Sequence, residues 1–126
     1  MGGLQRRTPL RRTATLKRST PLSPRNIGRR ARRFAEAFGE RGAAVRGRPC
    51  LCRGRSLTSP CSGPVEAAHA RSRGAGGTRR DLVPLCRGHH REQHRRGVRT
   101  FAATYQLDLD AEARRIAVEL DEEGLP

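Results

Sequence analysis

The chain has 126 residues, enough for one small domain with tails, and it carries a formal net charge of +15. Apolar residues make up 34% of it and there is no Trp, so we expect a core that needs a disulfide, a metal ion or a partner for stability. No segment has the pattern of a membrane span or a secretory signal, so the sequence predicts a cytoplasmic protein without a membrane partner.

Arginine supplies nearly all of the positive charge, because Lys17 is the only lysine. A GC-rich genome would explain arginine in place of lysine, but not the size of the imbalance. Arginine pairs bidentately with phosphate, so the excess predicts DNA or another nucleic acid as partner. Residues 1–28 contain no acid and are predicted to be a disordered basic arm. The predicted phosphate contacts are Arg6, Arg7, Arg11, Arg12, Lys17 and Arg18 in the arm, and Arg71, Arg73, Arg91 and Arg95 in the folded domain.

Residues 29–126 are predicted to form one α+β domain with little sheet. Its first element is a helix at 29–41, whose apolar face contains Phe34 and Phe38 together with Ala31 and Ala35, and Gly42 is its expected stop. A loop with three cysteines follows. Five further segments have the spacing of regular elements: short strands at 64–70 and 82–85, and helices at 87–97, 100–106 and 108–123. Asp108 or Asp110 can cap the last helix, whose buried face is predicted to contain Ala113, Ile116, Ala117 and Leu120.

The four cysteines of this chain favour metal binding over disulfides if the protein is cytoplasmic. Cys86 and His89 form a CxxH pair at a strand-to-helix junction, which is half of a tetrahedral zinc site. Five candidates compete for the four positions. We favour Cys50, Cys61, Cys86 and His89, with Cys52 as a substitute, because Cys50 and Cys52 are closer together than the usual CxxC pair. The alternative, four buried free thiols, fits poorly with so thin a core.

His90 and His94 are spaced i, i+4, so on a helix their Cβ atoms lie about 5–6 Å apart and their imidazoles can hold one divalent ion. The alternative is a basic helix face, since arginines surround both. Neighbouring helical residues project about 100° apart, so His89 and His90 can serve two different metal sites.

His69 is the remaining histidine, and it ends the first predicted strand. If the two strands pair and pack on the helix at 87–97, His69 faces His90 and His94. A neutral imidazole there can take a proton from a water that attacks a phosphodiester, while the metal stabilises the leaving oxygen. Asp81, at the end of the glycine-rich loop, is expected to orient His69.

The stretch "GPVEAAHARSRGAGGTRRDLVPLCRGHHREQH" (63–94), continuing through 97–109, resembles the HNH endonucleases, and most of all their small zinc-containing phage and prophage members, which include recombination-associated nucleases. With the cysteine region the resemblance covers residues 50–109. It implies a ββα-metal fold with its zinc and HNH core at 50–97. The implied activity is metal-dependent hydrolysis of DNA phosphodiesters, by nicking or double-strand cleavage, in a bacterial host or phage-infected cell. The implied cofactors are structural Zn²⁺ and a catalytic Mg²⁺ or Mn²⁺.

The resemblance also implies roles for particular residues. His69 matches the family's general base, His90 its last histidine, and His94 a further metal ligand. The chain departs from the family at Asp81, which stands in place of an asparagine, and at Ala68, where many members have a His or Asp metal ligand. Magnesium tolerates a site with few protein ligands because it keeps several waters. Ala68 nevertheless supports an alternative function: a zinc-stabilised DNA-binding protein with weak or no catalysis. We interpret Glu66 as an ordinary exposed acid, with an indirect part in the site as the alternative.

Overall fold

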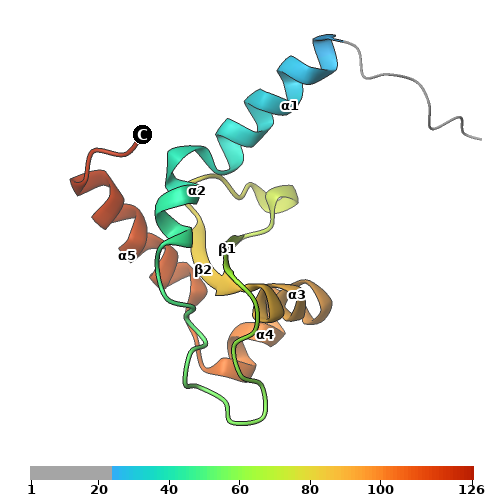
Figure 1. Cartoon of the computed structure of the whole chain (residues 1–126), viewed down its shortest axis with the longest axis vertical. Helices are drawn as coiled ribbons and strands as arrows, with labels where there is room; N and C mark the ends of the chain where they lie inside the picture. Colours follow the sequence, from blue (N-terminus) through green and yellow to red (C-terminus); the bar gives the residue numbers. More distant parts are fainter. Residues whose placement is uncertain (1–23) are drawn as a thin grey trace, which may run out of the picture.

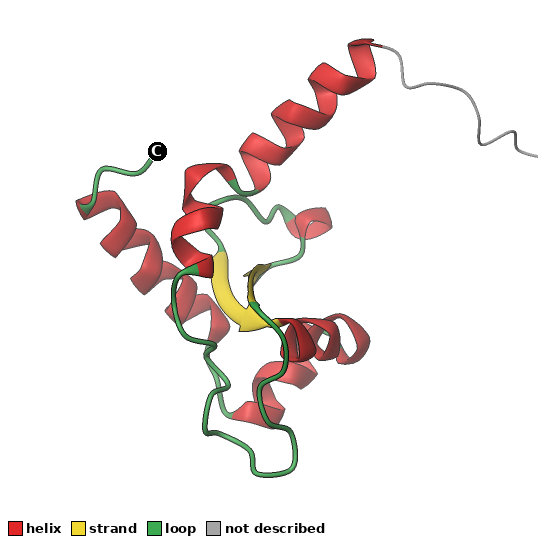
Figure 2. Cartoon of the chain, viewed as in Figure 1, coloured by secondary structure: helices red, strands yellow, loops and turns green. Residues whose placement is uncertain are grey.

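A computed structural model describes residues 24–126 of the chain. This part is α+β with little sheet, as predicted, and consists of five α-helices and a two-stranded antiparallel sheet (Figures 1 and 2). In chain order the elements are α1 (Pro24–Ala37), α2 (Gly39–Arg46), β1 (Val65–His69), the 3-10 turn η1 (Arg73–Ala75), β2 (Leu82–Cys86), α3 (Arg87–Arg96), α4 (Val98–Tyr105) and α5 (Leu109–Glu122). No helix among the described residues has the length and apolar character needed to cross a bilayer. The predicted phosphate contacts of the arm, Arg6, Arg7, Arg11, Arg12, Lys17 and Arg18, lie outside the described residues.

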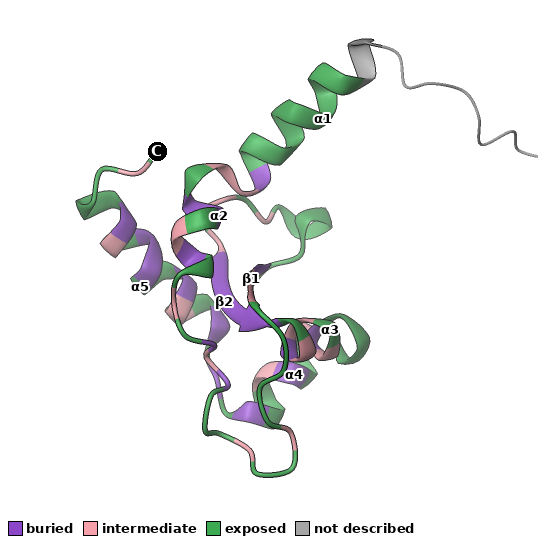
Figure 3. Ribbon diagram, viewed as in Figure 1, coloured by how far each residue is buried: buried purple, intermediate pink, exposed green. Residues whose placement is uncertain are grey.

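The first helical region differs from the prediction of one helix at 29–41. It begins earlier, at Pro24, whose fixed φ suits the first position of a helix. It then divides into α1 and α2 at Phe38, because Gly39 adopts a positive φ of 53°. Gly42, the expected stop, lies inside α2, where a Cβ atom would come within 3.0 Å of the Phe38 Cβ. The apolar face of α1 is exposed, and the helix projects from the body of the protein (Figures 1 and 3).

The sheet is a hairpin in which β1 pairs with β2 over five residues, from Val65 opposite Cys86 to His69 opposite Leu82. All residues of β2 are buried, whereas β1 is partly exposed. The helix α3 starts directly after β2, and the Cys86 side chain accepts a hydrogen bond from the His89 N–H as its cap. Gly97, with φ of 86°, ends α3 as predicted. The antiparallel hairpin therefore passes directly into the histidine-bearing helix.

The core has two parts, and neighbouring residues of β1 belong to different ones. Ala68 packs in the cluster that includes Phe101 and Tyr105 of α4, while Ala67 packs in the cluster that includes Leu82. Alternation along a strand sends successive side chains to opposite sides. The predicted face of the last helix is confirmed, since Ala113, Ile116, Ala117 and Leu120 are buried (Figure 3). Asp108, not Asp110, caps α5, accepting from the Ala111 N–H at 2.9 Å.

Arg41 of α2 is the largest fully buried side chain in the described residues, with 1% of its surface exposed. Its guanidinium pairs with Asp121 and donates to the backbone oxygens of Ala117 (3.2 Å) and Leu125 (2.7 Å). Arg80 and Arg41 together lower the pKa of Asp121 to about 2. Because folding lowers the pKa of Asp121, its ion pairs with Arg41 and Arg80 stabilise the fold at pH values above the ordinary pKa of Asp. This stabilisation is lost as the pH falls towards 2. Arg41 thus fastens α2 to the end of α5.

We expect Arg41→Met to lower the free energy of unfolding by about 2–4 kcal/mol, because buried carbonyls lose a charged donor. The matched control is Arg46→Met, an exposed residue of the same helix, with an expected change within about 0.5 kcal/mol. Urea unfolding of the zinc-loaded proteins measures both. Equal midpoints for the two variants would contradict a structural role for Arg41.

Candidate metal centre and histidine cavity

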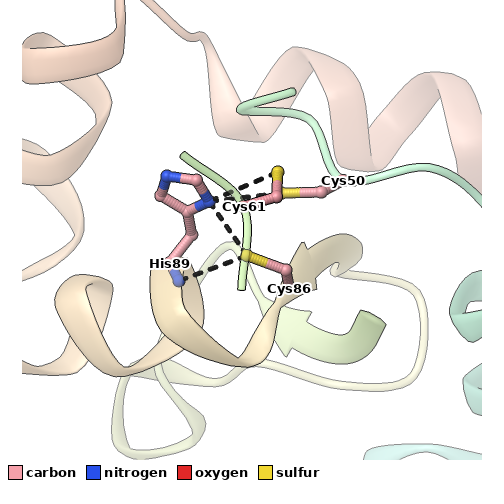
Figure 4. Close-up of side chains that lie close together, drawn as sticks. All are labelled: Cys50, Cys61, Cys86 and His89. Carbon is pink, nitrogen blue, oxygen red and sulfur yellow. Dashed lines mark hydrogen bonds between the residues drawn. The ribbon is translucent and has the colours of Figure 1, made fainter. Parts of the chain in front are cut away.

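Three thiols and one imidazole nitrogen converge where the loop at 50–62 meets the start of α3 (Figure 4). The ligand atoms of Cys50, Cys61, Cys86 and His89 all lie within 4.8 Å of one another. From His89 Nδ1 the sulfur atoms are at 3.0 Å (Cys86), 3.6 Å (Cys50) and 3.8 Å (Cys61). Zinc bonds of about 2.3 Å to sulfur and 2.0 Å to nitrogen give ligand separations of about 3.5–3.8 Å in a tetrahedron. The four residues are therefore close enough to hold one metal ion.

The hydrogen bonds of His89 set which ring nitrogen faces the sulfur atoms. Its Nε2–H donates to the Ser59 carbonyl oxygen at 3.0 Å, because a carbonyl can only accept. The lone pair of Nδ1 therefore points at the three thiols, as metal-bound histidines require. Tyr105 packs edge-on against the ring at 5.1 Å between centroids, and its hydroxyl lies 3.0 Å from Ser59 Oγ. The loop carbonyl and α4 thus hold the imidazole in a ligand orientation.

Close backbone approach brings the Cys61 loop onto α3. The Gly88 N–H donates to the Ser62 carbonyl oxygen at 3.0 Å, and a Cβ atom at Gly88 would lie 2.3 Å from Ser62 Oγ. The Ser62 N–H in turn donates to Cys86 Sγ at 3.4 Å. Glycine at position 88 therefore lets the loop donate to the thiol that also begins the helix.

Cys52 is buried beside this group but is not part of it. The neighbouring Cys52 thiol lowers the pKa of Cys50 to about 4, and Cys50 in turn raises the pKa of Cys52. The pKa of the Cys61 thiol is raised to about 12 by partial desolvation and by the neighbouring Cys50 and Cys86 sulfur atoms, although the residue is exposed. The structure gathers the four residues favoured from the sequence and leaves Cys52 outside the group.

A second candidate site lies between β1 and α3, where His69 of β1 and His90 and His94 of α3 line one cavity of about 570 Å³. The Nε2 atoms of His90 and His94 are 3.1 Å apart. Gln93 joins the two elements, since its side-chain amide donates to the His69 carbonyl oxygen at 3.1 Å. The structure therefore brings together the three histidines that the spacing and strand order pointed to.

Glu66 orients His90, although the favoured interpretation of the sequence was an exposed acid. The His90 Nδ1–H donates to Glu66 Oε2 at 2.8 Å, so the Nε2 lone pair of His90 is directed toward His94. Glu66 also pairs with Arg87 at 2.9 Å, and Arg87 and then His90 lower its pKa. Strand register carries a signal for this contact: Glu66 lies opposite Leu85, next to the first turn of α3.

The imidazole of His69 is held by α1. Its Nε2 lies 2.9 Å from the Ala37 carbonyl oxygen, so Nε2 carries the proton and Nδ1 keeps a free lone pair. The Phe38 ring packs against it in an edge geometry at 4.9 Å between centroids. Burial lowers the pKa of His69, which keeps the imidazole neutral near pH 7.

Asp81 is expected from the sequence to orient His69, but the structure gives its carboxylate another partner. Asp81 does not hold the His69 imidazole: its Oδ2 accepts from the Thr78 N–H at 2.8 Å and the Thr78 hydroxyl at 3.2 Å. Asp81 accepts from Thr78 in place of His69 because Thr78 lies three residues away in the same turn. Ala68 is fully buried in the core, and β1 lines the histidine cavity with Ala67 and His69 instead.

The predicted phosphate contacts of the folded domain are all exposed: Arg71, Arg73, Arg91 and Arg95. None of them pairs with an acid of the described residues. Arg73 lines the histidine cavity, whereas Arg91 and Arg95 line a separate cavity together with Ser62. Positive charge is thus available on both sides of α3.

These features define a small α+β protein with a Cys₃His cluster and an adjoining histidine-lined cavity. Comparison with protein-family models, curated proteins and solved structures gives no match to the chain. Its function is therefore inferred from the geometry of the two sites.

Proposed function

We propose that the protein is a metal-dependent DNA endonuclease with a zinc-stabilised ββα-metal core of the HNH type. The observation that carries this proposal is the shared cavity of His69, His90 and His94 at the junction of an antiparallel hairpin and the following helix. One imidazole there is suited to accept a proton, and the other two are suited to bind a cation. This pairing of a base with a cation site is the arrangement that phosphodiester hydrolysis needs.

The residues of the cavity divide the reaction between them. His69 accepts a proton at Nδ1 from the attacking water, and the Ala37 carbonyl keeps the ring in the required tautomer. Glu66 keeps the His90 Nε2 lone pair directed at the cavity. Arg73 places positive charge beside the phosphate. A divalent cation such as Mg²⁺ or Mn²⁺, bound by His90 and His94, would supply further charge for the leaving oxygen.

The Cys₃His cluster serves the fold in this proposal, with Zn²⁺ as its ion. Three thiols and one imidazole are a common donor set of structural zinc, and all four positions are filled by the protein. The cluster joins the 50–62 loop to β2 and α3. It therefore fixes the helix on which His90 and His94 stand.

A zinc-stabilised DNA-binding protein that does not cleave is the second candidate. Ala68 favours it, because its methyl group lies in the core and supplies no ligand to the cavity. The exposed arginines would serve such a protein equally well.

A plasmid nicking assay of the zinc-loaded protein with Mg²⁺, with Mn²⁺ or without either metal tests the proposal. We expect conversion of supercoiled to open-circular or linear DNA with either metal and none without them. Salt-sensitive DNA binding without cleavage in every metal would establish the second candidate. Absence of both binding and cleavage would contradict both candidates.

We expect Glu66→Ala to weaken Mn²⁺ binding at His90 and His94 by about 10–100-fold, because the ligand loses its orienting acceptor. Glu66→Gln keeps an acceptor for the His90 N–H and should lose less. The matched control is Arg87→Ala, which removes the other partner of Glu66 but leaves the carboxylate on His90. Electron paramagnetic resonance of Mn²⁺ titrated into zinc-loaded protein measures all three. Unchanged affinity in Glu66→Ala would show that Glu66 does not position this ligand.

A further inference from the structure

The histidine cavity continues along the surface to α1. It shares Phe38 and Arg73 with a neighbouring cavity of about 340 Å³, whose other lining residues are Arg30, Arg33 and Phe34. All three of these residues belong to α1. The proposed site of hydrolysis and the projecting helix therefore form one continuous surface.

The charges on this surface have no partner within the described chain. Arg30, Arg33 and Arg73 form no ion pair with an acid of residues 27–126. No carboxylate lines the cavity between them. Glu36 lines a third cavity together with Arg33 and Arg73, beside the glycine-rich loop, but it forms no ion pair with either arginine. A polyanion following the surface from the histidines would thus meet three free guanidinium groups in succession.

The apolar side of α1 is also uncovered. Phe34 is 58% exposed and Ile27 59% exposed, and they lie seven residues apart on the same helical face. Phe34 stacks in a tilted geometry on Phe38, at 5.2 Å between centroids, and Phe38 itself contacts the ring of His69. An aromatic ring between arginines, next to a phosphate site, fits a sugar or base face.

We propose that α1 binds the DNA strand that flanks the phosphodiester held in the histidine cavity. Arg30, Arg33 and Arg73 contact its phosphates, and Phe34 packs against a sugar or base. The inference rests on the proposed function, because that function places the cleaved phosphodiester in the histidine cavity. Charge selects this occupant over a second copy of the chain, because two α1 helices would bring their arginines together.

DNA binding by the zinc-loaded protein, without added Mg²⁺ or Mn²⁺, tests the arginines without cleavage. The variant Arg30→Ala/Arg33→Ala is compared with Arg53→Ala/Arg114→Ala, which removes the same charge from exposed, unpaired residues that line none of these cavities. Fluorescence anisotropy of a labelled duplex is recorded over a KCl series. We expect the slope of log K against log [KCl] to fall by about 1.8 for the α1 variant, since each phosphate contact contributes about 0.9. The control variant should keep the slope of the unsubstituted protein. Equal slopes for the two variants would overturn the inference.

Photocrosslinking tests the aromatic contact. The photoreactive p-benzoylphenylalanine is incorporated in place of Phe34 and, as control, in place of Val118, which is 56% exposed on α5. We expect a covalent DNA adduct from position 34 and none from position 118. Protein–protein adducts from position 34 without a DNA adduct would overturn the inference in favour of a second copy.

Nicking measured on the same proteins separates this inference from the proposed function. DNA adducts at position 34 together with a reduced salt slope, but no nicking in any metal, would support α1 as a DNA contact and refute the nuclease. Nicking that is indifferent to Arg30 and Arg33 at sub-saturating DNA would refute the α1 contact and support the nuclease.

Discussion

Replacing His69 with alanine is expected to reduce Mg²⁺-dependent nicking by about 10²–10⁴-fold, the usual contribution of a general base. His69 is the one imidazole of the cavity whose free nitrogen is not directed at another histidine or an acid. Its removal should leave DNA affinity and bound zinc unchanged. Added imidazole should restore part of the rate, because a small base can enter the space left by the side chain. Loss of nicking without rescue, together with a lowered unfolding midpoint, would indicate a structural role instead.

The pH profile gives a second measure of the same residue. Burial places the pKa of His69 below its ordinary value of 6.5, and only the unprotonated ring can accept a proton. Nicking should therefore rise with pH through this pKa and level off by neutral pH. In the imidazole-rescued His69→Ala protein the rise should move to the pKa of the added base. An identical profile in both proteins would exclude His69 as the group that titrates.

Cys86→Ser is expected to abolish both metal retention and cooperative unfolding. Cys86 ends β2, caps α3 and supplies one of the four ligand atoms. Structural zinc contributes about 10–16 kcal/mol of binding free energy in small domains, comparable to or larger than the about 5–15 kcal/mol stability of an ordinary domain. We expect one zinc per full-length chain by mass spectrometry of metals, and thermal unfolding at low temperature after chelation.

Cys52→Ala is the matched control for the metal centre. Cys52 is as buried as Cys86, but it is not among the residues of the cluster. This variant should keep one zinc per chain and a cooperative transition. Loss of zinc in Cys52→Ala, with retention in Cys61→Ala, would reassign the fourth ligand from Cys61 to Cys52.

The sequence by itself determined the parts of both sites that depend on local geometry. The CxxH spacing of Cys86 and His89 puts two ligands on one turn at the start of a helix, whatever the rest of the chain does. The i, i+4 spacing puts His90 and His94 on one helical face. Asp108 and Gly97 mark helix ends through their own backbone and side-chain chemistry.

Only the tertiary structure decided which groups meet these local units across the chain. The contact of Glu66 with His90 depends on strand register. The hydrogen bond that Asp81 accepts from Thr78, in place of one from His69, depends on the conformation of the loop. The burial of Arg41 against α5 has no local pattern, since its partners are 76 or more positions away. Periodicity within a helix reports only which side chains share a face. Whether that face is covered, as in α5, or left open, as in α1, depends on packing between distant segments.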